Sequence, residues 1–267
     1  MILLREKERR LYYDFIGGRN GHVVCFVHSI AADSGMWAEQ ASALIADGYG
    51  VLRIDLPGHG GSETVAGDLT SQHVVDDVLA ILDVNRIERV HFVGLSIGGV
   101  VGQAFAATNG NRLRTLVLSN TVPKSSPEAS AAWAGRIAAV RQAGSTSPLA
   151  EGMIERWISA AVMQNEPSKW GRTLQGILAT SAEGFIGCAV LMQNFDFTAS
   201  LSQIKTPTLV IAGSDDGAAP AAAGRSIAQT IPNAIYKELP NSRHLPNLEH
   251  PALYNRVLAD WLTEHRT

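Results

Sequence analysis

Ser96 is the residue whose surroundings best suit nucleophilic chemistry. It stands in Gly94-Leu95-Ser96-Ile97-Gly98, at the end of the apolar run "VHFVG". This spacing fits a sharp turn from a strand into a helix, which exposes the serine hydroxyl above a sheet. Glycine is expected on both sides because a Cβ at position 94 or 98 would meet neighbouring backbone. Chance produces such a pentapeptide in about one chain in ten, but here a predicted strand precedes it and a predicted helix follows it.

A serine nucleophile needs a base, and the base needs an acid that orients it. On a turn of this kind, the acid and then the histidine follow the serine along the chain. Asp216 comes just after the apolar run "TLVIAG", and His244 precedes the last predicted helix. This order predicts a triad of Ser96, Asp216 and His244. Asp215 is the alternative acid, and His250 is the alternative base, although it lies beside a helix start and is expected at the surface.

Two backbone amides are expected to stabilise the oxyanion that forms when the serine attacks. One is the N–H of Ile97, which directly follows the serine, and the other comes from the loop after the strand "VVCFV". In that loop, Ile30 is the best candidate. His28 in the same loop and His59 in "DLPGHGGSE" are interpreted as residues that pack loops rather than as acids or bases.

The elements that would position these residues alternate between strand and helix. Short, nearly continuous apolar runs are typical of strands that are buried on both faces. The segment "RRLYYDFIG" is expected to form an antiparallel strand or hairpin ahead of this repeat. The predicted strands are residues 23–27, 51–54, 90–94, 114–119, 208–213 and 235–239, and apolar residues recur at helical spacing in 71–83 and 251–262. The pattern predicts an α/β fold with a mostly parallel central sheet and helices on both faces.

The alternation stops between about residues 122 and 200. This stretch contains Trp133, Trp157 and Trp170 and reads as successive helices without a convincing strand. We call residues 122–200 the cap, and we expect residues 1–121 and 201–267 to form one core domain. An insertion at this point would cover a site at the carboxyl ends of the strands. Trp133 and Trp157 are the leading candidates to line the pocket beneath it.

Composition and charge argue against several other classes of protein. The formal net charge of −3 gives no basic surface for nucleic acid. The only two cysteines, Cys25 and Cys188, lie far apart without metal-ligand spacing, which fits a reducing compartment. The sequence shows neither a signal peptide nor an apolar stretch long enough to span a membrane. We therefore expect a cytoplasmic protein with a small-molecule partner, no metal or organic cofactor, and no pattern that sets an oligomeric state.

The motifs together resemble those of the α/β-hydrolase superfamily over nearly the whole chain. The shared stretches are "DLPGHGGS", "GLSIGG", "TLVIAGSDD" and "HLPNLEHP". Within the superfamily, the sequence is most similar to 3-oxoadipate enol-lactonases, through "SIAADSGMWAEQ" and the cap stretches "WAGRIAAVRQAG", "ERWIS" and "ATSAEGF". This resemblance implies a serine hydrolase that opens an enol-lactone with water to give an oxo acid.

One departure from that family concerns the substrate. Gln193 and Asn194 stand in the cap where the family commonly carries Arg-Asp. An arginine there would pair with a free carboxylate on the substrate. Arg136 and Arg156 could do this instead, so Trp133, Arg136, Trp157 and Gln193 are the expected substrate-binding residues.

Three other activities remain open. The same triad could serve a carboxylesterase, or a hydrolase of carbon–carbon bonds, that acts on a neutral substrate. A ligand receptor that turns over slowly could keep the same fold. Ser96 argues against haloalkane dehalogenases and epoxide hydrolases, which resemble this fold but carry aspartate at that position.

Overall fold

The fold is organised around one eight-stranded sheet. The structure is a computed structural model that describes residues 1–5 and 9–266. The strands lie in the order β1-β2-β4-β3-β5-β6-β7-β8; β1 pairs antiparallel with β2, β2 pairs antiparallel with β4, and all other neighbours are parallel. Their bounds are β1 Ile2–Leu4, β2 Arg10–Ile16, β3 Val23–Val27, β4 Gly50–Ile54, β5 Val90–Leu95, β6 Leu113–Ser119, β7 Thr208–Gly213 and β8 Ile235–Leu239. The predicted mostly parallel sheet, with an antiparallel hairpin at its start, is confirmed.

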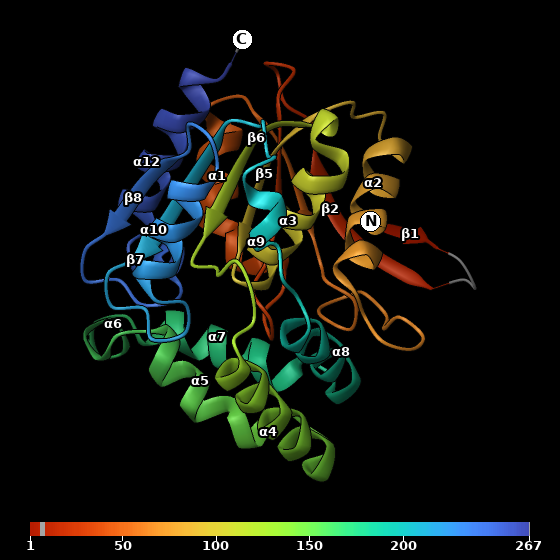
Figure 1. Cartoon of the computed structure of the whole chain (residues 1–267), viewed down its shortest axis with the longest axis vertical. Helices are drawn as coiled ribbons and strands as arrows, with labels where there is room; N and C mark the ends of the chain where they lie inside the picture. The colour runs from red at the N-terminus through yellow and green to blue at the C-terminus, as the bar shows by residue number, and fades with distance from the viewer. Residues whose placement is uncertain (6–8, 267) are drawn as a thin grey trace.

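Helices cover both faces of this sheet. Figure 1 shows α1 and α12 on one face and α2 and α3 on the other, and the members of each pair contact one another. The helix bounds are α1 Ala38–Ala46, α2 Ser71–Val84, α3 Ile97–Asn109, α4 Pro127–Ala143, α5 Ala150–Trp157, α6 Ala160–Asn165, α7 Pro167–Ala179, α8 Ala182–Gln193, α9 Thr198–Leu201, α10 Ala221–Thr230, α11 Pro246–Glu249 and α12 Pro251–Glu264. Among the described residues, no single helix is long and apolar enough to cross a membrane, although α7 and α8, bent by 95°, meet that test together.

The sequence signals for these elements have direct structural counterparts. Every residue of β5 and of β7 is buried, which explains why both strands read as nearly continuous apolar runs. Helix α2 begins after Thr70, whose side chain accepts a hydrogen bond from the His73 amide and so caps the first turn. Pro251 stands in the first turn of α12, where its missing N–H costs nothing.

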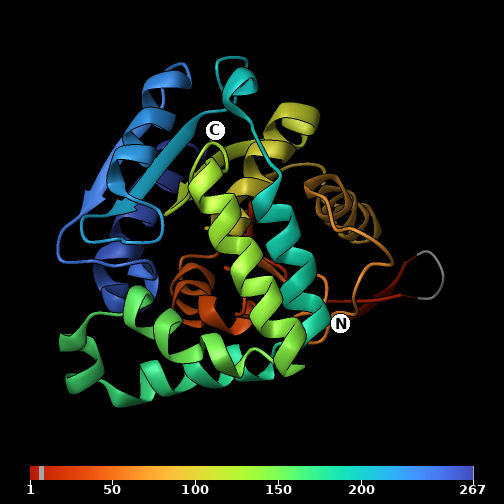
Figure 2. The same cartoon turned by 60° about the horizontal axis from the view of Figure 1, so that its bottom comes forward.

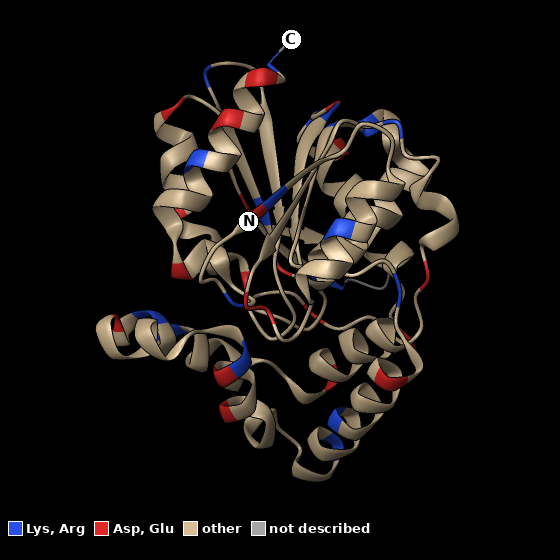
Figure 3. Cartoon of the chain, turned by 60° about the vertical axis from the view of Figure 1, so that its left-hand side comes forward, with Lys and Arg blue, Asp and Glu red and all other residues tan. Residues whose placement is uncertain are grey.

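The cap contains helices α4 to α8 and lies across one end of the core. Figures 1 and 3 show these helices as a separate layer beside the carboxyl ends of the strands, with scattered charged residues. The cap leaves and re-enters the core at the same place. The Ser125 amide donates to the Phe195 carbonyl (3.0 Å), and the Phe197 amide donates to the Pro123 carbonyl (2.9 Å). Beyond this double connection, α4 and α8 run side by side (Figure 2).

A second contact joins the cap to the loop after β4. A Cβ on Gly184, in the first turn of α8, would lie 2.2 Å from the Gly58 carbonyl oxygen. Gly58 also has a φ of +75°, a conformation that side chains rarely adopt. The Ser181 hydroxyl donates to the same carbonyl (3.2 Å). The two glycines therefore let the cap backbone rest directly on the core.

A buried histidine in β5 links the fold to pH. The Nδ1 of His91 lies 3.0 Å from the Thr115 hydroxyl on β6, and its Nε2 lies 3.1 Å from Nδ1 of His22. Burial is the main cause that lowers the pKa of His91 to about 3, and the charges of His22 and Arg114 lower it further. The imidazole is therefore neutral in the folded protein.

We predict that this histidine makes the protein sensitive to mild acid. Its pKa falls from 6.5 to about 3 on folding, so the folded state binds fewer protons than the unfolded state in that window. The free energy of unfolding should fall as the pH drops through the window, by about 2 kcal/mol between pH 7 and pH 5 for His91 alone. Urea unfolding at both pH values, with His91→Asn as the control that cannot titrate, measures this contribution. An equal loss of stability in both proteins would contradict the prediction.

Candidate active site

Ser96 occupies a strained turn between β5 and α3. Its backbone has φ 58° and ψ −116°, which is unusual for a residue with a side chain. Hydrogen bonds hold this conformation: the Ser96 amide donates to the Ser119 carbonyl (2.9 Å), and the Ser96 carbonyl accepts from the Gly99 amide and the Thr121 hydroxyl (2.9 Å each). Such strain persists only where the surrounding structure enforces it. The turn projects the hydroxyl beyond the end of the sheet.

The glycines around Ser96 are required by close backbone approach. A Cβ on Gly94 would lie 2.1 Å from the Gly98 carbonyl oxygen. A Cβ on Gly98 would lie 2.3 Å from the carbonyl oxygen of Val27 at the end of β3. Both distances are far below van der Waals contact, so the steric reason expected from the sequence is confirmed.

Asp216 and His244 meet behind this turn, from the loops that follow β7 and β8. Nδ1 of His244 lies 2.8 Å from Oδ2 of Asp216. The same oxygen accepts from the Asn120 amide (2.8 Å), while Oδ1 accepts from the backbone amides of Ala218 (2.7 Å) and Ala219 (3.0 Å). Burial by itself would raise the pKa of Asp216, but the charge and hydrogen bonds of His244, with the Ala219 and Asn120 amides, outweigh it and lower the pKa. The carboxylate is therefore ionised and its position is fixed.

The alternative acid and base point elsewhere. Asp215 is exposed and accepts a hydrogen bond from the Ser214 hydroxyl (2.8 Å). Nε2 of His250 lies 2.9 Å from the Asn241 carbonyl. The geometry therefore favours Asp216 over Asp215 and His244 over His250.

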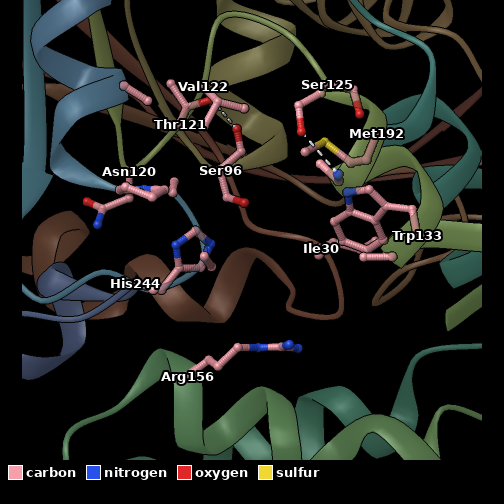
Figure 4. A pocket seen from close by; sticks show the side chains of 18 of the residues that line it. Ile30, Ser96, Asn120, Thr121, Val122, Ser125, Trp133, Arg156, Met192 and His244 are labelled. Atoms are coloured by element: carbon pink, nitrogen blue, oxygen red, sulfur yellow. Dashed lines mark hydrogen bonds between the residues drawn. The ribbon is translucent and has the colours of Figure 1, made fainter. Parts of the chain in front are cut away.

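Ser96 and His244 line the same cavity, and Figure 4 shows their side chains on the same side of it, opposite Arg156. Within the described chain, no hydrogen bond joins the Ser96 hydroxyl to His244. Catalytic hydrogen bonds are often long without a substrate and shorten when one binds. The arrangement has the order and orientation of a nucleophile, a base and an acid.

The two amides expected to bind an oxyanion have no acceptor of their own. Ile97 is the first residue of α3, so its N–H has no partner inside the helix. The Ile30 amide likewise donates to no other group of the described residues. Both residues are buried, and buried amides are nearly always paired. An oxygen atom of a bound substrate would satisfy them, and Ile30 lines the cavity.

Two buried histidines fix the loop that carries Ile30. His59 accepts from the Ala31 amide through Nε2 (3.0 Å) and donates from Nδ1 to the Pro57 carbonyl (3.0 Å). His28 accepts from the Leu56 amide (2.9 Å) and donates to its neighbouring Ser29 carbonyl (2.7 Å). Burial, followed by the charge of His28, lowers the pKa of His59 to about 3. Both rings are therefore neutral, and both nitrogens of each ring are hydrogen-bonded to backbone groups. This agrees with the interpretation of His28 and His59 as loop-packing residues.

Sequence reasoning missed Asn120, which joins the two loops of the acid and the base. Its amide nitrogen donates to Asp216 Oδ2 (2.8 Å) and to the Arg243 carbonyl (3.1 Å). The Ser119 hydroxyl donates to its amide oxygen (3.1 Å), which sets the orientation of the amide group. Asn120 directly follows β6, so its place at the carboxyl end of a core strand was the available signal.

The cavity has a volume of about 480 Å³ and is bounded by both the core and the cap. From the core it is lined by Ile30, Ser96, Asn120, Thr121, Gly217, Ala218, Ala219, Pro220, Ala223 and His244; from the cap, by Val122, Pro123, Lys124, Ser125, Ser126, Ala129, Ala132, Trp133, Arg136, Met153, Arg156, Trp157, Phe185, Met192 and Phe195. Trp157 packs beside the base, with its ring centroid 6.0 Å from that of His244. The structure thus brings the expected Trp133, Arg136 and Trp157 to the same space as Ser96.

Gln193 lies outside this lining, contrary to expectation. It is the last residue of α8, and its amide nitrogen donates to the Ser130 carbonyl of α4 (3.0 Å). The side chain therefore links two cap helices instead of facing the substrate space. The expectation failed because similarity in sequence does not show in which direction a side chain on a helix points.

The cavity is positively charged. Its lining includes Lys124, Arg136 and Arg156 and, within the described chain, no aspartate or glutamate. Neither arginine lies within ion-pair distance of a carboxylate among those residues. Arg136 stacks over the Trp133 ring at 4.4 Å, and Arg156 lies on the cap side, opposite Ser96 and His244 (Figure 4). Burial, and then the positive charge of Arg156, lowers the pKa of Arg136. An anion bound between the two arginines would offset both of these unfavourable effects on the charged form of Arg136.

In the described residues, no three His, Cys, Asp or Glu side chains gather closely enough to hold a metal ion. Cys25 and Cys188 are both buried and free.

Known proteins share this architecture. A family model described as the alpha/beta hydrolase fold matches residues 22–251. A 3-oxoadipate enol-lactonase of Acinetobacter baylyi is 29% identical over 96% of this chain and 94% of its own. A relative from Pseudomonas savastanoi that is named as a carbamate hydrolase is 29% identical over 87% and 90%. The crystal structure of the enol-lactonase from Burkholderia xenovorans has a TM-score of 0.92 and 33% identity, and covers 98% of this chain and 100% of that one.

The family match spans most of the chain and includes the Ser96 turn and the loops of Asp216 and His244. The resemblance to 3-oxoadipate enol-lactonases that the motifs indicated is confirmed in both sequence and structure. The chain therefore belongs to the α/β hydrolase family.

Proposed function

We propose that this hydrolase uses Ser96 to open the lactone or ester bond of a small substrate that carries a carboxylate, as a 3-oxoadipate enol-lactonase would. The observation that carries the proposal is the set of residues that line one cavity. Ser96 and His244 lie on one side of it and Arg156 lies opposite them (Figure 4); Arg136 also lines the cavity, and neither arginine has a carboxylate partner among the described residues. Arg136 is half-buried and Arg156 is exposed, so an anionic substrate group in this cavity would gain a charge-assisted pair with them.

The reaction follows from the positions of the groups. The Ser96 hydroxyl attacks the carbonyl carbon while Nε2 of His244 takes the proton, and Asp216 holds the opposite ring nitrogen and stabilises the imidazolium. The amides of Ile30 and Ile97 donate to the oxyanion of the tetrahedral intermediate. When that intermediate collapses, the carbon–oxygen bond of the leaving group breaks and His244 returns the proton to the leaving oxygen.

The second half of the reaction uses the same groups. His244 takes a proton from a water molecule that attacks the acyl group on Ser96, and the proton then returns to the serine. With a lactone, the leaving oxygen stays attached to the acyl chain, so one product is released. If that oxygen is an enol, it ketonises to the oxo acid.

The same nucleophile could also attack a neutral ester, a carbamate or a diketone. One relative of this chain is named as a carbamate hydrolase, which shows that near relatives are assigned to different bonds. The charge of the cavity favours the acidic substrate among these, because only a substrate with a negative charge would form a charge pair with the two arginines.

We predict that Ser96→Ala, Asp216→Asn and His244→Ala each lower kcat for lactone hydrolysis by about a thousandfold or more, because the three groups act as a unit. Steady-state kinetics on the purified variants, with circular dichroism to confirm folding, measures this. Asp215→Asn is the matched control, since Asp215 is exposed and does not contact His244. Near-native turnover in Ser96→Ala would refute the mechanism, and loss of activity in Asp215→Asn alone would move the acid by one residue.

We also predict that the arginines distinguish substrates by charge. Arg136→Ala should lower kcat/KM about 10- to 150-fold for a lactone with a free carboxylate, because a charge-assisted hydrogen bond contributes about 1.5–3 kcal/mol. The methyl ester of the same lactone keeps the reacting bond but lacks the charge, so its kcat/KM should change about twofold at most. Arg156→Ala should show the same pattern, and Arg136→Lys should retain part of the preference. Equal losses on both substrates would make Arg136 structural, and a wild-type preference for the neutral lactone would exclude the acidic substrate.

A further inference from the structure

The loop that carries His244 is bound to the cap over three consecutive residues. The Arg243 guanidinium donates to the carbonyls of Glu155 and Ile158 at the end of α5, the second at 3.4 Å. The amide of Leu245 donates to the Trp157 carbonyl (3.3 Å). We call residues 155–159 the cap junction, since they connect α5 to α6. His244 itself packs against Trp157 of this junction.

Glu249 adds a further connection between the histidine loop and the cap junction. Its side chain is buried, with 3% of the residue exposed, and it forms no ion pair with any described residue. One carboxylate oxygen accepts from the Ser159 amide of the cap junction (2.7 Å). The other accepts from the amide of Arg243, the residue before His244 (2.5 Å). A single buried carboxylate therefore holds the cap and the histidine loop at a fixed separation.

We propose that Glu249 is a positioning residue that sets the place of His244 by fastening its loop to the cap junction. The inference rests on the proposed function, since it assumes that His244 is the base. Asp216 fixes the ring of His244 through Nδ1 and holds its orientation, but it does not hold the backbone of residue 243. Asn120 holds the Arg243 carbonyl from the core (3.1 Å), whereas Glu249 and the Arg243 guanidinium tie this residue to the cap junction.

The consequence is that the cap junction contributes to the rate of the chemical step as well as to substrate binding. Nε2 of His244 must come within hydrogen-bond reach of the Ser96 hydroxyl, and a displacement of about 1 Å can cost about 100-fold in rate. If the carboxylate is removed or displaced, the backbone amides of Ser159 and Arg243 lose their acceptor, and the histidine loop separates from the junction.

A substitution in the cap tests this without touching the core. Ser159 has φ −68° and ψ 151°, and Ile158 before it has φ −130° and ψ 133°. Both conformations suit a proline at position 159. Ser159→Pro removes the N–H that Glu249 accepts and places a ring carbon where that hydrogen pointed. Ser159→Ala is the matched control: it keeps the N–H and loses only the hydroxyl, which accepts from the Val162 amide at 3.4 Å.

The primary readout is the rate at which a small fluorophosphonate modifies Ser96. This reagent needs the serine and its base but not the arginines of the cavity. We expect Ser159→Pro to slow the modification about tenfold or more relative to Ser159→Ala, with a matching fall in kcat for a short nitrophenyl ester. Glu249→Gln offers a second test, because its amide can accept only one of the two N–H groups and presents hydrogens to the other. It should slow the modification to a similar degree in protein that circular dichroism shows to be folded.

Each outcome separates this inference from the proposed function. If Ser159→Pro and folded Glu249→Gln both react like Ser159→Ala, the inference is wrong, although the triad could still stand. A change in KM alone, with the modification rate unchanged, would mean that the junction only shapes the cavity, which also overturns it. If the reagent does not modify Ser96 in the wild-type protein, the proposed function itself fails.

Discussion

The site depends on one backbone constraint: Ser96 is held at a positive φ between a strand and a helix that approach too closely for any Cβ. The contacts at Gly94 and Gly98 bring β5, the end of β3 and the start of α3 together, so the turn cannot relax. Two results follow from this packing. The hydroxyl stands clear of the sheet, and the first amide of α3, that of Ile97, is left without an acceptor. The proposed nucleophile and one of the two proposed oxyanion donors therefore come from the same turn.

The parallel sheet supplies the remaining groups by placing strand ends on one edge. Ile30 follows β3, Asn120 follows β6, Asp216 follows β7 and His244 follows β8. Each loop is then fixed by a buried polar contact: His59 holds the Ile30 loop, Asn120 joins the acid and base loops, and Glu249 ties the base loop to the cap. In each case a backbone amide or carbonyl receives its partner from a buried side chain, which accounts for the polar groups so close to the core.

The sequence was sufficient for the sheet, because buried parallel strands leave unbroken apolar runs, and for the Ser96 turn, because close backbone approach leaves glycines. It also placed Asp216 and His244, whose contact the structure shows, by their order after the serine. It could not identify Asn120 or Glu249, since their importance lies in hydrogen bonds between loops that are distant along the chain. Gln193 was expected to bind substrate because of its place in the family pattern, but its side chain contacts α4 instead. The direction in which it points depends on how α4 and α8 pack, which similarity in sequence does not give. The sequence indicated that Arg136 and Arg156 could pair with a substrate carboxylate, but whether they line one cavity depends on how two different helices pack.

The central claim is that Ser96 is the nucleophile of a single hydrolytic site. Peptide mapping after treatment with a small fluorophosphonate tests it most directly, with lactone hydrolysis followed in the same samples. The account predicts one adduct, on Ser96, and a loss of hydrolysis in proportion to the fraction of protein modified. Full modification of Ser96 with hydrolysis retained, or loss of hydrolysis with the adduct on another residue, would contradict it.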